Sequence, residues 1–398
     1  MARRLTFYEF FAGGGMARVG LGASWTCLFA NDIDAGKARA YRANWGEGDF
    51  WLGDLAQAPF ERLTGVADLA WASFPCQDLS LAGIGMGMGG ATDEVKTRSG
   101  AFWLFHEKMQ ALRDAGRAPR LIVLENVLGV LTSHGKRDFA AIVEALAALG
   151  YRVGAVTMDA RHFTPQSRPR VFFVAALQKV FDDLATGPSD DMRIGGAADP
   201  LWHSPALCAA QAALPDSAAE KWVWWRMPQP PLRRAVLSDL IEAEPKGVHW
   251  RDGAATTSLL ALMNPAHRAK IAEIQASGQK RIGAVYRRTR RDEAGGKAQR
   301  AEVRFDGLAG CLRTPGGGSS RQTIVEVAGK NIRSRLLSPR EAARLMGLPD
   351  SYILPEKTTE AYHLLGDGVC APVVRYLAAQ LLEPLALAGE SGQLLAAE

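Results

Sequence analysis

The first half of the chain alternates short apolar runs with segments whose apolar residues recur at helical spacing. The runs predict strands at 5–11, 25–30, 67–72, 121–124, 151–158 and 171–177. The helical spacing predicts helices at 35–44, 99–115 and 137–149. Strands that alternate with helices are typical of an α/β fold with a doubly wound, mostly parallel sheet. Ligands of such sheets bind beyond the carboxyl ends of the strands, so candidate chemistry is sought there first.

The alternation stops beyond the last of these runs. Residues 178–321 are rich in Pro, Trp and Arg and show no sustained period. A helical pattern returns at Ser338, which stands as an N-cap before Pro339 and three residues ahead of Glu341, the arrangement of a capping box. A last apolar helix is predicted at 373–382. We therefore predict three parts, a first domain at 1–180, a smaller irregular lobe at 181–325 and a C-terminal segment at 326–398.

Composition places the chain among ordinary globular proteins. It has 398 residues, of which 47% are hydrophobic and 22% charged. No stretch approaches about 18 consecutive apolar residues, so no transmembrane helix is predicted. The N-terminus lacks the pattern of a signal peptide, and we expect a cytoplasmic protein. The five cysteines are far apart and never in Cys-x-x-Cys spacing. This argues against a disulfide framework and a zinc site, and we expect no metal.

The positive charge is concentrated in one segment. The whole chain carries a net charge of +5, whereas residues 281–322 alone contain ten Arg and Lys against four Asp and Glu, a local charge of +6. Clustered cations of this kind are typical of a nucleic-acid-binding face, with a solvated charged surface as the alternative. Arg and Gln side chains suit phosphates and base edges. The candidate DNA contacts are Arg287, Arg288, Arg290, Arg313, Arg321 and Gln322.

One cysteine stands directly after a predicted strand. Pro75 fixes its own φ and donates no backbone hydrogen bond, so the strand ends there and Cys76 is presented by a stiff backbone. Residues 83–90 beyond it contain five glycines, which makes this loop costly to order. A lone cysteine is most often a buried structural residue. The interpretation as a reactive thiol depends on two motifs further along, Glu125-Asn126 at the end of one strand and Gln166-Ser167-Arg168-Pro169-Arg170 before another.

The turn after the first strand is rich in glycine. Phe11-Ala12-Gly13-Gly14-Gly15 lacks the third glycine of a dinucleotide-binding fingerprint, because Arg18 stands at that position. A tight connection without a ligand is the alternative. Asp32 and Asp54 follow at later strand ends. Their carboxylates suit ribose hydroxyls and an exocyclic amine, although each alone is equally well interpreted as a solvated turn acid.

These motifs, in this order from Glu9 to Val374, resemble the DNA (cytosine-5) methyltransferase family of bacteria and phages. The resemblance implies the class I S-adenosylmethionine-dependent methyltransferase fold. It implies a catalytic and cofactor-binding domain at 1–180, a target-recognition domain at 181–325, and a segment at 326–398 that returns to the catalytic domain. It further implies an enzyme that transfers a methyl group from S-adenosylmethionine to C5 of a flipped cytosine in a short sequence of double-stranded DNA. The loop at 81–99 corresponds to a lid over that base.

The resemblance assigns catalytic roles to four residues. Cys76 attacks C6 of the ring, and Glu125 protonates or hydrogen-bonds the N3/O2 side. Arg168 holds the O2 edge of the base, while Arg170 braces the site together with Gln166. The target base must leave the helix, because none of these groups can reach C5 or C6 in stacked duplex. The sequence does not identify the base that removes the C5 proton.

The resemblance also implies how the cofactor is held. The glycine turn approaches the methionine part of S-adenosylmethionine, Asp32 the ribose, Ile33 an adenine face and Asp54 the adenine amine. Asp367 is a departure, because the family usually has Asn at this position. The implied cofactor-binding set is Phe11, Ala12, Gly13, Gly15, Asp32, Ile33, Asp54, Leu55, Pro75, Asp367 and Val369.

Three other functions compete with this interpretation. A catalytically silent DNA-binding module is disfavoured by the joint presence of Cys76, Glu125, Arg168 and Arg170. An RNA methyltransferase of the same family is disfavoured by the large Arg-rich lobe, since sequence reading in a groove needs such an insert. A Rossmann oxidoreductase is disfavoured by the missing third glycine. We expect a monomer. A cognate restriction endonuclease, where there is one, would act separately; the sequence predicts neither the target site nor whether the enzyme is paired with an endonuclease, an orphan or phage-borne.

Overall fold

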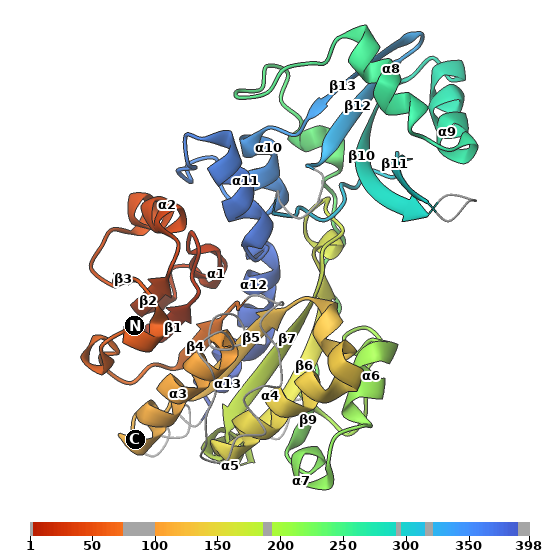
Figure 1. The fold of residues 1–398 in the computed structure, drawn as a ribbon. Coiled ribbons are helices and arrows are strands. Elements are labelled where there is room, and N and C mark those ends of the chain that lie inside the picture. Colours follow the sequence, from red (N-terminus) through yellow and green to blue (C-terminus); the bar gives the residue numbers. More distant parts are fainter. Residues whose placement is uncertain (1–2, 75–99, 186–192, 292–295, 315–320, 389–398) are drawn as a thin grey trace, which may run out of the picture. The chain divides into compact units, whose positions relative to one another are not determined.

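The computed structural model describes residues 3–74, 100–185, 193–291, 296–314 and 321–388. The chain divides into two compact units (Figure 1). The first, called here the α/β unit, comprises Met1–Met158, Pro169–Gln229 and Val373–Glu398, and the second, called the recognition unit, comprises Asp159–Arg168 and Pro230–Pro372. The chain thus passes between the two units after residues 158, 168, 229 and 372, and the functional ranges 1–180, 181–325 and 326–398 stay predictions.

A mixed, mostly parallel sheet forms the centre of the α/β unit. Among the described residues its strand order is β3-β2-β1-β4-β5-β7-β6-β9-β8. Strand β1 pairs in parallel with β2 and β4, and β4 with β5, whereas β7 is antiparallel to β5. The strands are β1 (Leu5–Phe10), β2 (Trp25–Asp32), β3 (Phe50–Leu52), β4 (Leu69–Ala72), β5 (Leu121–Asn126), β6 (Tyr151–Asp159), β7 (Pro169–Leu177), β8 (Ile194–Gly195) and β9 (Trp222–Trp225). The predicted α/β class and all six predicted strands are confirmed.

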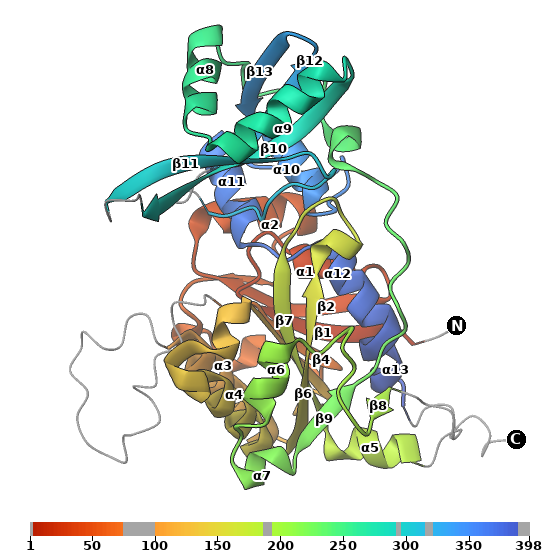
Figure 2. The ribbon, with the colours of Figure 1, turned by 90° about the vertical axis from the view of Figure 1, so that its right-hand side faces the viewer.

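Helices cover both faces of this sheet, so its inner strands are apolar on both sides. Figure 2 shows α3 (Ala101–Asp114) and α4 (Arg137–Ala148) on one side of the strands, and α12 (Ala371–Leu377) and α13 (Glu383–Ala386) on the other. Helix α2 (Ala35–Trp45), like α3 and α4, is present where the spacing predicts it. The shorter helices are α1 (Met16–Leu21), α5 (Gln178–Ala185), α6 (Pro205–Gln211) and α7 (Asp216–Ala219).

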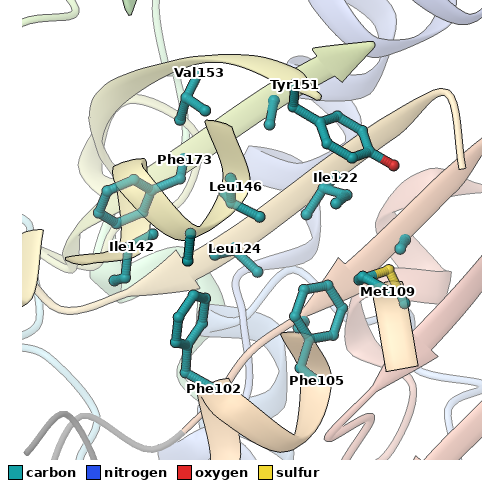
Figure 3. Close-up of a cluster of buried hydrophobic side chains, with 14 of the residues drawn as sticks. Phe102, Phe105, Met109, Ile122, Leu124, Ile142, Leu146, Tyr151, Val153 and Phe173 are labelled. Atoms are coloured by element: carbon teal, nitrogen blue, oxygen red, sulfur yellow. The ribbon is translucent and has the colours of Figure 1, made fainter. Parts of the chain in front are cut away.

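The core of the α/β unit lies between α3, α4 and the sheet. Phe102 and Phe105 of α3 face Leu124 of β5, and Ile142 and Leu146 of α4 belong to the same cluster (Figure 3). All of these side chains are at most 1% exposed. Burial of each large apolar side chain stabilises the fold by roughly 1.5–3 kcal/mol. The cluster therefore holds β5 firmly in the sheet, and the predicted residues Glu125 and Asn126 lie at the end of that strand.

A four-stranded antiparallel sheet, with strand order β11-β10-β12-β13, forms the recognition unit with its helices. Its strands are β10 (Lys280–Arg291), β11 (Lys297–Arg304), β12 (Thr323–Ala328) and β13 (Asn331–Leu336). Helices α8 (Gly253–Ala261) and α9 (Pro265–Ala276) lie beside it (Figure 1), and Leu259 and Ile271 pack on Val285 and Val325. The unit also contains α10 (Pro339–Leu345) and α11 (Thr358–Asp367).

The capping box predicted at Ser338 is present. The Ser338 hydroxyl accepts the Glu341 N–H at 3.1 Å, and the Glu341 carboxylate accepts the Ser338 N–H at 2.7 Å. The α10 helix therefore begins where its sequence places it. Across the described residues, no helix is long and apolar enough to cross a membrane.

Candidate active site

The predicted nucleophile lies outside the described residues, as does Pro75. The chain that leads to them is firmly held. Phe74 is buried, and its carbonyl accepts a hydrogen bond from Nδ2 of Asn126 at 3.3 Å. Asn126 in turn accepts the Val127 N–H through Oδ1 at 2.8 Å. The end of β5 thus fixes the backbone just ahead of Cys76.

Buried Glu125 and partly buried Arg170 form an ion pair in the α/β unit. Nε of Arg170 lies 3.0 Å from Oε1 of Glu125, and their side chains are only 15% and 7% exposed. The two residues come from neighbouring antiparallel strands, β5 and β7, near the end where Asn126 faces Val171. A guanidinium beside a carboxylate in a largely dry site orients that carboxylate and offers further donors to a bound group.

The glycine turn is tied to the carboxylate of Asp32, the last residue of β2. Oδ2 of Asp32 accepts the Gly13 N–H at 2.8 Å, and Oδ1 accepts the Asp34 N–H at 2.8 Å. Asp32 is only 6% exposed, and burial raises the pKa of its carboxyl group, while Lys37 and the two N–H groups oppose that shift. Phe11 has a positive φ of 56°, an uncommon conformation for a residue with a Cβ. The turn and the carboxylate therefore form one fixed unit.

Three further predicted cofactor residues of this unit, Ile33, Asp54 and Leu55, lie just beyond the ends of β2 and β3. The Ile33 side chain is 70% exposed, unusual for a large apolar group next to a buried carboxylate. Asp54 caps the short helix Leu55–Gln57 by accepting the Ala56 N–H at 3.0 Å, and Leu55 is buried. Nδ2 of Asn31 donates to the Gly53 carbonyl at 2.9 Å, which holds the Asp54 segment against the end of β2.

Side chains that the sequence did not predict to take part in the site support the glycine turn. Nε1 of Trp45 donates to the Gly14 carbonyl at 3.2 Å. The Arg18 guanidinium stacks on Trp45 at 4.6 Å and donates to Asp49 at 2.6 Å. Gly15 has a φ of 75°, and an added Cβ would lie 2.4 Å from Nε1 of Trp45, so this position requires glycine. The only sequence signal was Arg18 itself, at the position of the absent third glycine.

Arg168 lies in the recognition unit, and its guanidinium donates to backbone carbonyls. Nη1 donates to Leu312 at 2.8 Å, and Nη2 donates to Gly366 at 2.9 Å and to Gly368 at 2.6 Å. The residue is 2% exposed. Gln166 of the same motif is fully buried and accepts the Leu312 N–H through Oε1 at 3.0 Å. Both side chains therefore hold backbone segments together.

Asp367 and Val369 lie in the same turn that Arg168 holds. Asp367 is exposed at the end of α11, and its carboxylate accepts a hydrogen bond from the Thr314 hydroxyl. Val369 is buried. The carboxylate at the position where the family usually has Asn is thus engaged with the segment 311–314.

The arginine-rich strands form a two-stranded ribbon beyond the small sheet. β10 pairs with β12 only as far as Val285, but with β11 as far as Arg291 (Figure 2). Arg287 and Arg288 are exposed on this ribbon, and Arg288 stacks on Tyr286 at 4.6 Å. The side chain of Arg290 lies outside the described part. A two-stranded ribbon has the width that the major groove of DNA admits.

The other predicted DNA contacts differ in exposure. Arg313 is exposed, and Arg321 is half-buried with its guanidinium 5.2 Å from the ring centre of Tyr362. Gln322 is buried, and its amide donates to the Cys311 carbonyl at 3.4 Å. Within the described residues, no group of three His, Cys, Asp or Glu side chains could hold a metal ion.

The side chains around the glycine turn suit the binding of S-adenosylmethionine. Buried Asp32 and capping Asp54 offer carboxylate oxygens for ribose hydroxyls and an amine, and exposed Ile33 offers an apolar face for a purine. An added Cβ on Gly13 would meet nothing within 4 Å, so the turn leaves open space beside the Asp32 carboxylate. Carboxylates in place of a phosphate cradle fit a nucleoside that carries a sulfonium amino acid instead of phosphates.

Known proteins are similar to this chain over nearly its whole length. The family model for C-5 cytosine-specific DNA methylase matches residues 5–383. The type II methyltransferase M.NlaX of Neisseria lactamica is 27% identical over 94% of this chain and 95% of its own length. M.HhaI of Haemophilus parahaemolyticus is 25% identical over 94% of this chain and 93% of its own.

A solved structure agrees at the level of the fold. The S. pombe Dnmt2 methyltransferase aligns with a TM-score of 0.54 at 17% identity, over 96% of this chain and 99% of its own. The fold, the paired Glu125 and Arg170, the Asp32-bound glycine turn and the matched length lead to one conclusion. The chain belongs to the C-5 cytosine-specific DNA methylase family, enzymes that take their methyl group from S-adenosylmethionine.

Proposed function

We propose that this enzyme methylates C5 of a cytosine that is flipped out of a short duplex DNA sequence, through a covalent bond between Cys76 and C6. The ion pair between buried Glu125 and partly buried Arg170 is the observation that carries the proposal. It sets an acid and a cation side by side near the end of β5, whose Asn126 also binds the backbone that leads to Cys76. An acid and a cation close to a nucleophile are the groups that activate a pyrimidine ring for nucleophilic addition.

The chemistry begins with Cys76. C5 of cytosine is a poor nucleophile, and addition of the Cys76 thiolate to C6 makes C5 enamine-like. A free thiol is only a few per cent ionised near neutral pH, so neighbouring cations and the substrate assist its ionisation. The π electron pair of the C5=C6 double bond moves onto C5 and is delocalised through C4 to N3, where a proton or hydrogen bond from Glu125 stabilises it. S-adenosylmethionine supplies the methyl group from its sulfonium. A base then removes the C5 proton, and the Cys76 sulfur leaves with the electron pair of its bond to C6.

We propose that Arg168 and Arg170 have the opposite roles to those that the resemblance implies. The resemblance gives Arg168 the O2 edge of the base and Arg170 a bracing role. Arg170, however, is the arginine paired with Glu125, whereas Arg168 donates to the carbonyls of Leu312, Gly366 and Gly368. We therefore assign the O2 edge to Arg170 and a positioning role to Arg168. Gln166 and Gln322 act through backbone segments in the same way.

We assign DNA contacts to the ribbon of β10 and β11 together with Arg313 and Arg321. Arg287 and Arg288 of the ribbon are exposed, and they lie beyond Val285, where the pairing of β10 with β12 ends. We expect Arg287→Ala to reduce the salt dependence of DNA binding by about one counterion, since each phosphate contact releases roughly one. The matched control is Arg281→Ala, an exposed arginine at the other end of β10 that donates to Gln279. An equal salt slope in Arg287→Ala and wild type would remove the ribbon from the proposed interface.

The decisive experiment traps the covalent bond. Wild-type enzyme with S-adenosylmethionine and 5-fluorocytosine-containing duplex DNA is expected to give a protein–DNA adduct stable to denaturation, because fluorine cannot leave as a proton does. Cys76→Ser is expected to form no adduct and to bind S-adenosylhomocysteine with unchanged affinity. Bisulfite sequencing of a host that expresses the wild type then reports the target sequence. Adduct formation by Cys76→Ser, methylation of tRNA but not DNA, or no adduct in a wild type that binds the cofactor would each refute the proposal.

We further propose that the enzyme acts as a monomer, with any cognate restriction endonuclease acting separately.

A further inference from the structure

Arg168 joins three backbone segments that are distant in sequence. It sits in the motif segment 165–168, where the Pro165 carbonyl accepts the Ala309 N–H at 2.8 Å and the Ser167 N–H donates to the Ala309 carbonyl at 3.0 Å. From there its guanidinium reaches the Leu312 carbonyl and both glycine carbonyls of the turn 366–368. A planar guanidinium fixes the geometry of its acceptors, because its donors form a rigid fork.

Two further contacts close the gap between the segment 311–314 and the turn 366–368. An added Cβ on Gly366 would lie 2.5 Å from the Thr314 nitrogen, so the two backbones touch at a position that only glycine permits. The Thr314 hydroxyl donates to the Asp367 carboxylate. The Arg168 fork, the glycine contact and this hydrogen bond together form what is called here the Arg168 junction.

The two sides of the junction carry different candidate functions. On one side, Arg313 is exposed within the segment, and the Gln322 amide binds the Cys311 carbonyl, which ties the segment to the residues beside Arg321. Arg321 itself stacks on Tyr362 of α11. On the other side, α11 ends in the turn that carries Asp367 and Val369. Candidate DNA contacts and candidate cofactor contacts therefore share one rigid connection.

We propose that Arg168 is a positioning residue that couples DNA binding to cofactor binding. This inference rests on the proposed function, which supplies both ligands. DNA held at Arg313 and Arg321 fixes the segment 311–314, and the junction then fixes the turn of Asp367 in its cofactor-binding geometry. The coupling is reciprocal, so the cofactor tightens DNA binding by the same factor.

The test measures the affinity for S-adenosylhomocysteine by calorimetry, with and without a duplex that carries the site found by bisulfite sequencing. In wild type we expect the duplex to tighten binding by roughly 5- to 150-fold. Arg168→Lys replaces the fork by a single ammonium, and Thr314→Val removes the hydroxyl that binds Asp367. Both are expected to reduce the factor to less than about a third of its wild-type value. Arg340→Lys is the matched control, since the Arg340 guanidinium also donates to two backbone carbonyls, those of Pro349 and Tyr352, outside the junction.

The outcomes separate the two proposals. A coupling factor that falls in Thr314→Val and Arg168→Lys but not in Arg340→Lys supports the junction. If Arg168→Lys does not fold, Thr314→Val decides alone. A wild type that methylates DNA while its variants keep the full coupling factor overturns the inference and leaves the proposed function intact. A wild type that neither methylates DNA nor binds S-adenosylhomocysteine overturns both.

Discussion

Arg170 contacts Glu125 through Nε at 3.0 Å, with both side chains largely withdrawn from solvent. The pair joins β5 to β7 and presents a carboxyl group whose orientation depends on the guanidinium. Glu125→Gln is therefore expected to lower kcat by about 10²- to 10⁴-fold, the usual contribution of a positioned acid. Its affinity for S-adenosylhomocysteine should change little, because Glu125 lies outside the predicted cofactor set. Single-turnover methylation and calorimetry measure the two effects.

The same pair predicts strong non-additivity. Arg170→Ala is expected to lower kcat by about as much as Glu125→Gln, since the two side chains act as one group. The double variant should then be little slower than either single one. Losses that multiply in the double variant would mean that Arg170 and Glu125 act independently.

The sequence predicted the central sheet because strands buried on both faces must be continuously apolar, as Leu121–Leu124 is. It did not predict β10–β13. The ribbon half of β10 is exposed and rich in Arg, so it has no apolar period. The other half of β10 pairs with β12, which is distant in sequence. The motif also could not separate Arg168 from Arg170. Two arginines two residues apart are chemically equal, and only Glu125 beside one and the Leu312 and Gly366 carbonyls beside the other distinguish them.

The support beneath the glycine turn gives a third prediction. Trp45→Phe keeps a ring under the Arg18 guanidinium but loses the hydrogen bond to the Gly14 carbonyl. A neutral hydrogen bond contributes about 0.5–1.5 kcal/mol, so we expect KM for S-adenosylmethionine to rise roughly 2- to 12-fold with kcat nearly unchanged. Steady-state kinetics at saturating DNA measure both. The control is Trp222→Phe in β9, whose Nε1 has no partner among the described residues. Equal KM values in Trp45→Phe and wild type would exclude this supporting role.

The buried carboxyl group of Glu9 should make the unfolding free energy of the protein depend on pH. It is 1% exposed in β1, and burial raises the pKa of its carboxyl group from 4.5 to about 8, against the opposing charge of Arg18. A raised pKa means that the folded state holds a proton that the unfolded state releases. The stabilisation is therefore complete below pH 4.5 and is lost as the pH rises to about 8. Relative to Glu9→Gln, wild type should lose up to about 1.4 kcal/mol of unfolding free energy per pH unit in that window. Denaturant titrations at several pH values measure this difference, and parallel profiles would contradict the assignment.

A fully buried ion pair predicts where the recognition unit is most sensitive. Arg335 and Glu341 are both completely buried, 2.7 Å apart, and Glu341 also accepts the backbone N–H groups of Glu242 and Ser338. Arg335→Met leaves that carboxylate without its guanidinium, which should cost about 3–5 kcal/mol of unfolding free energy. Adding Glu341→Gln removes the uncompensated charge and should recover part of the loss. Lys280→Met is the control, because Lys280 is 61% exposed in its pair with Glu326 and should contribute less than about 1 kcal/mol. A double variant less stable than Arg335→Met would show that the Glu341 backbone contacts, rather than the ion pair, hold α10 in place.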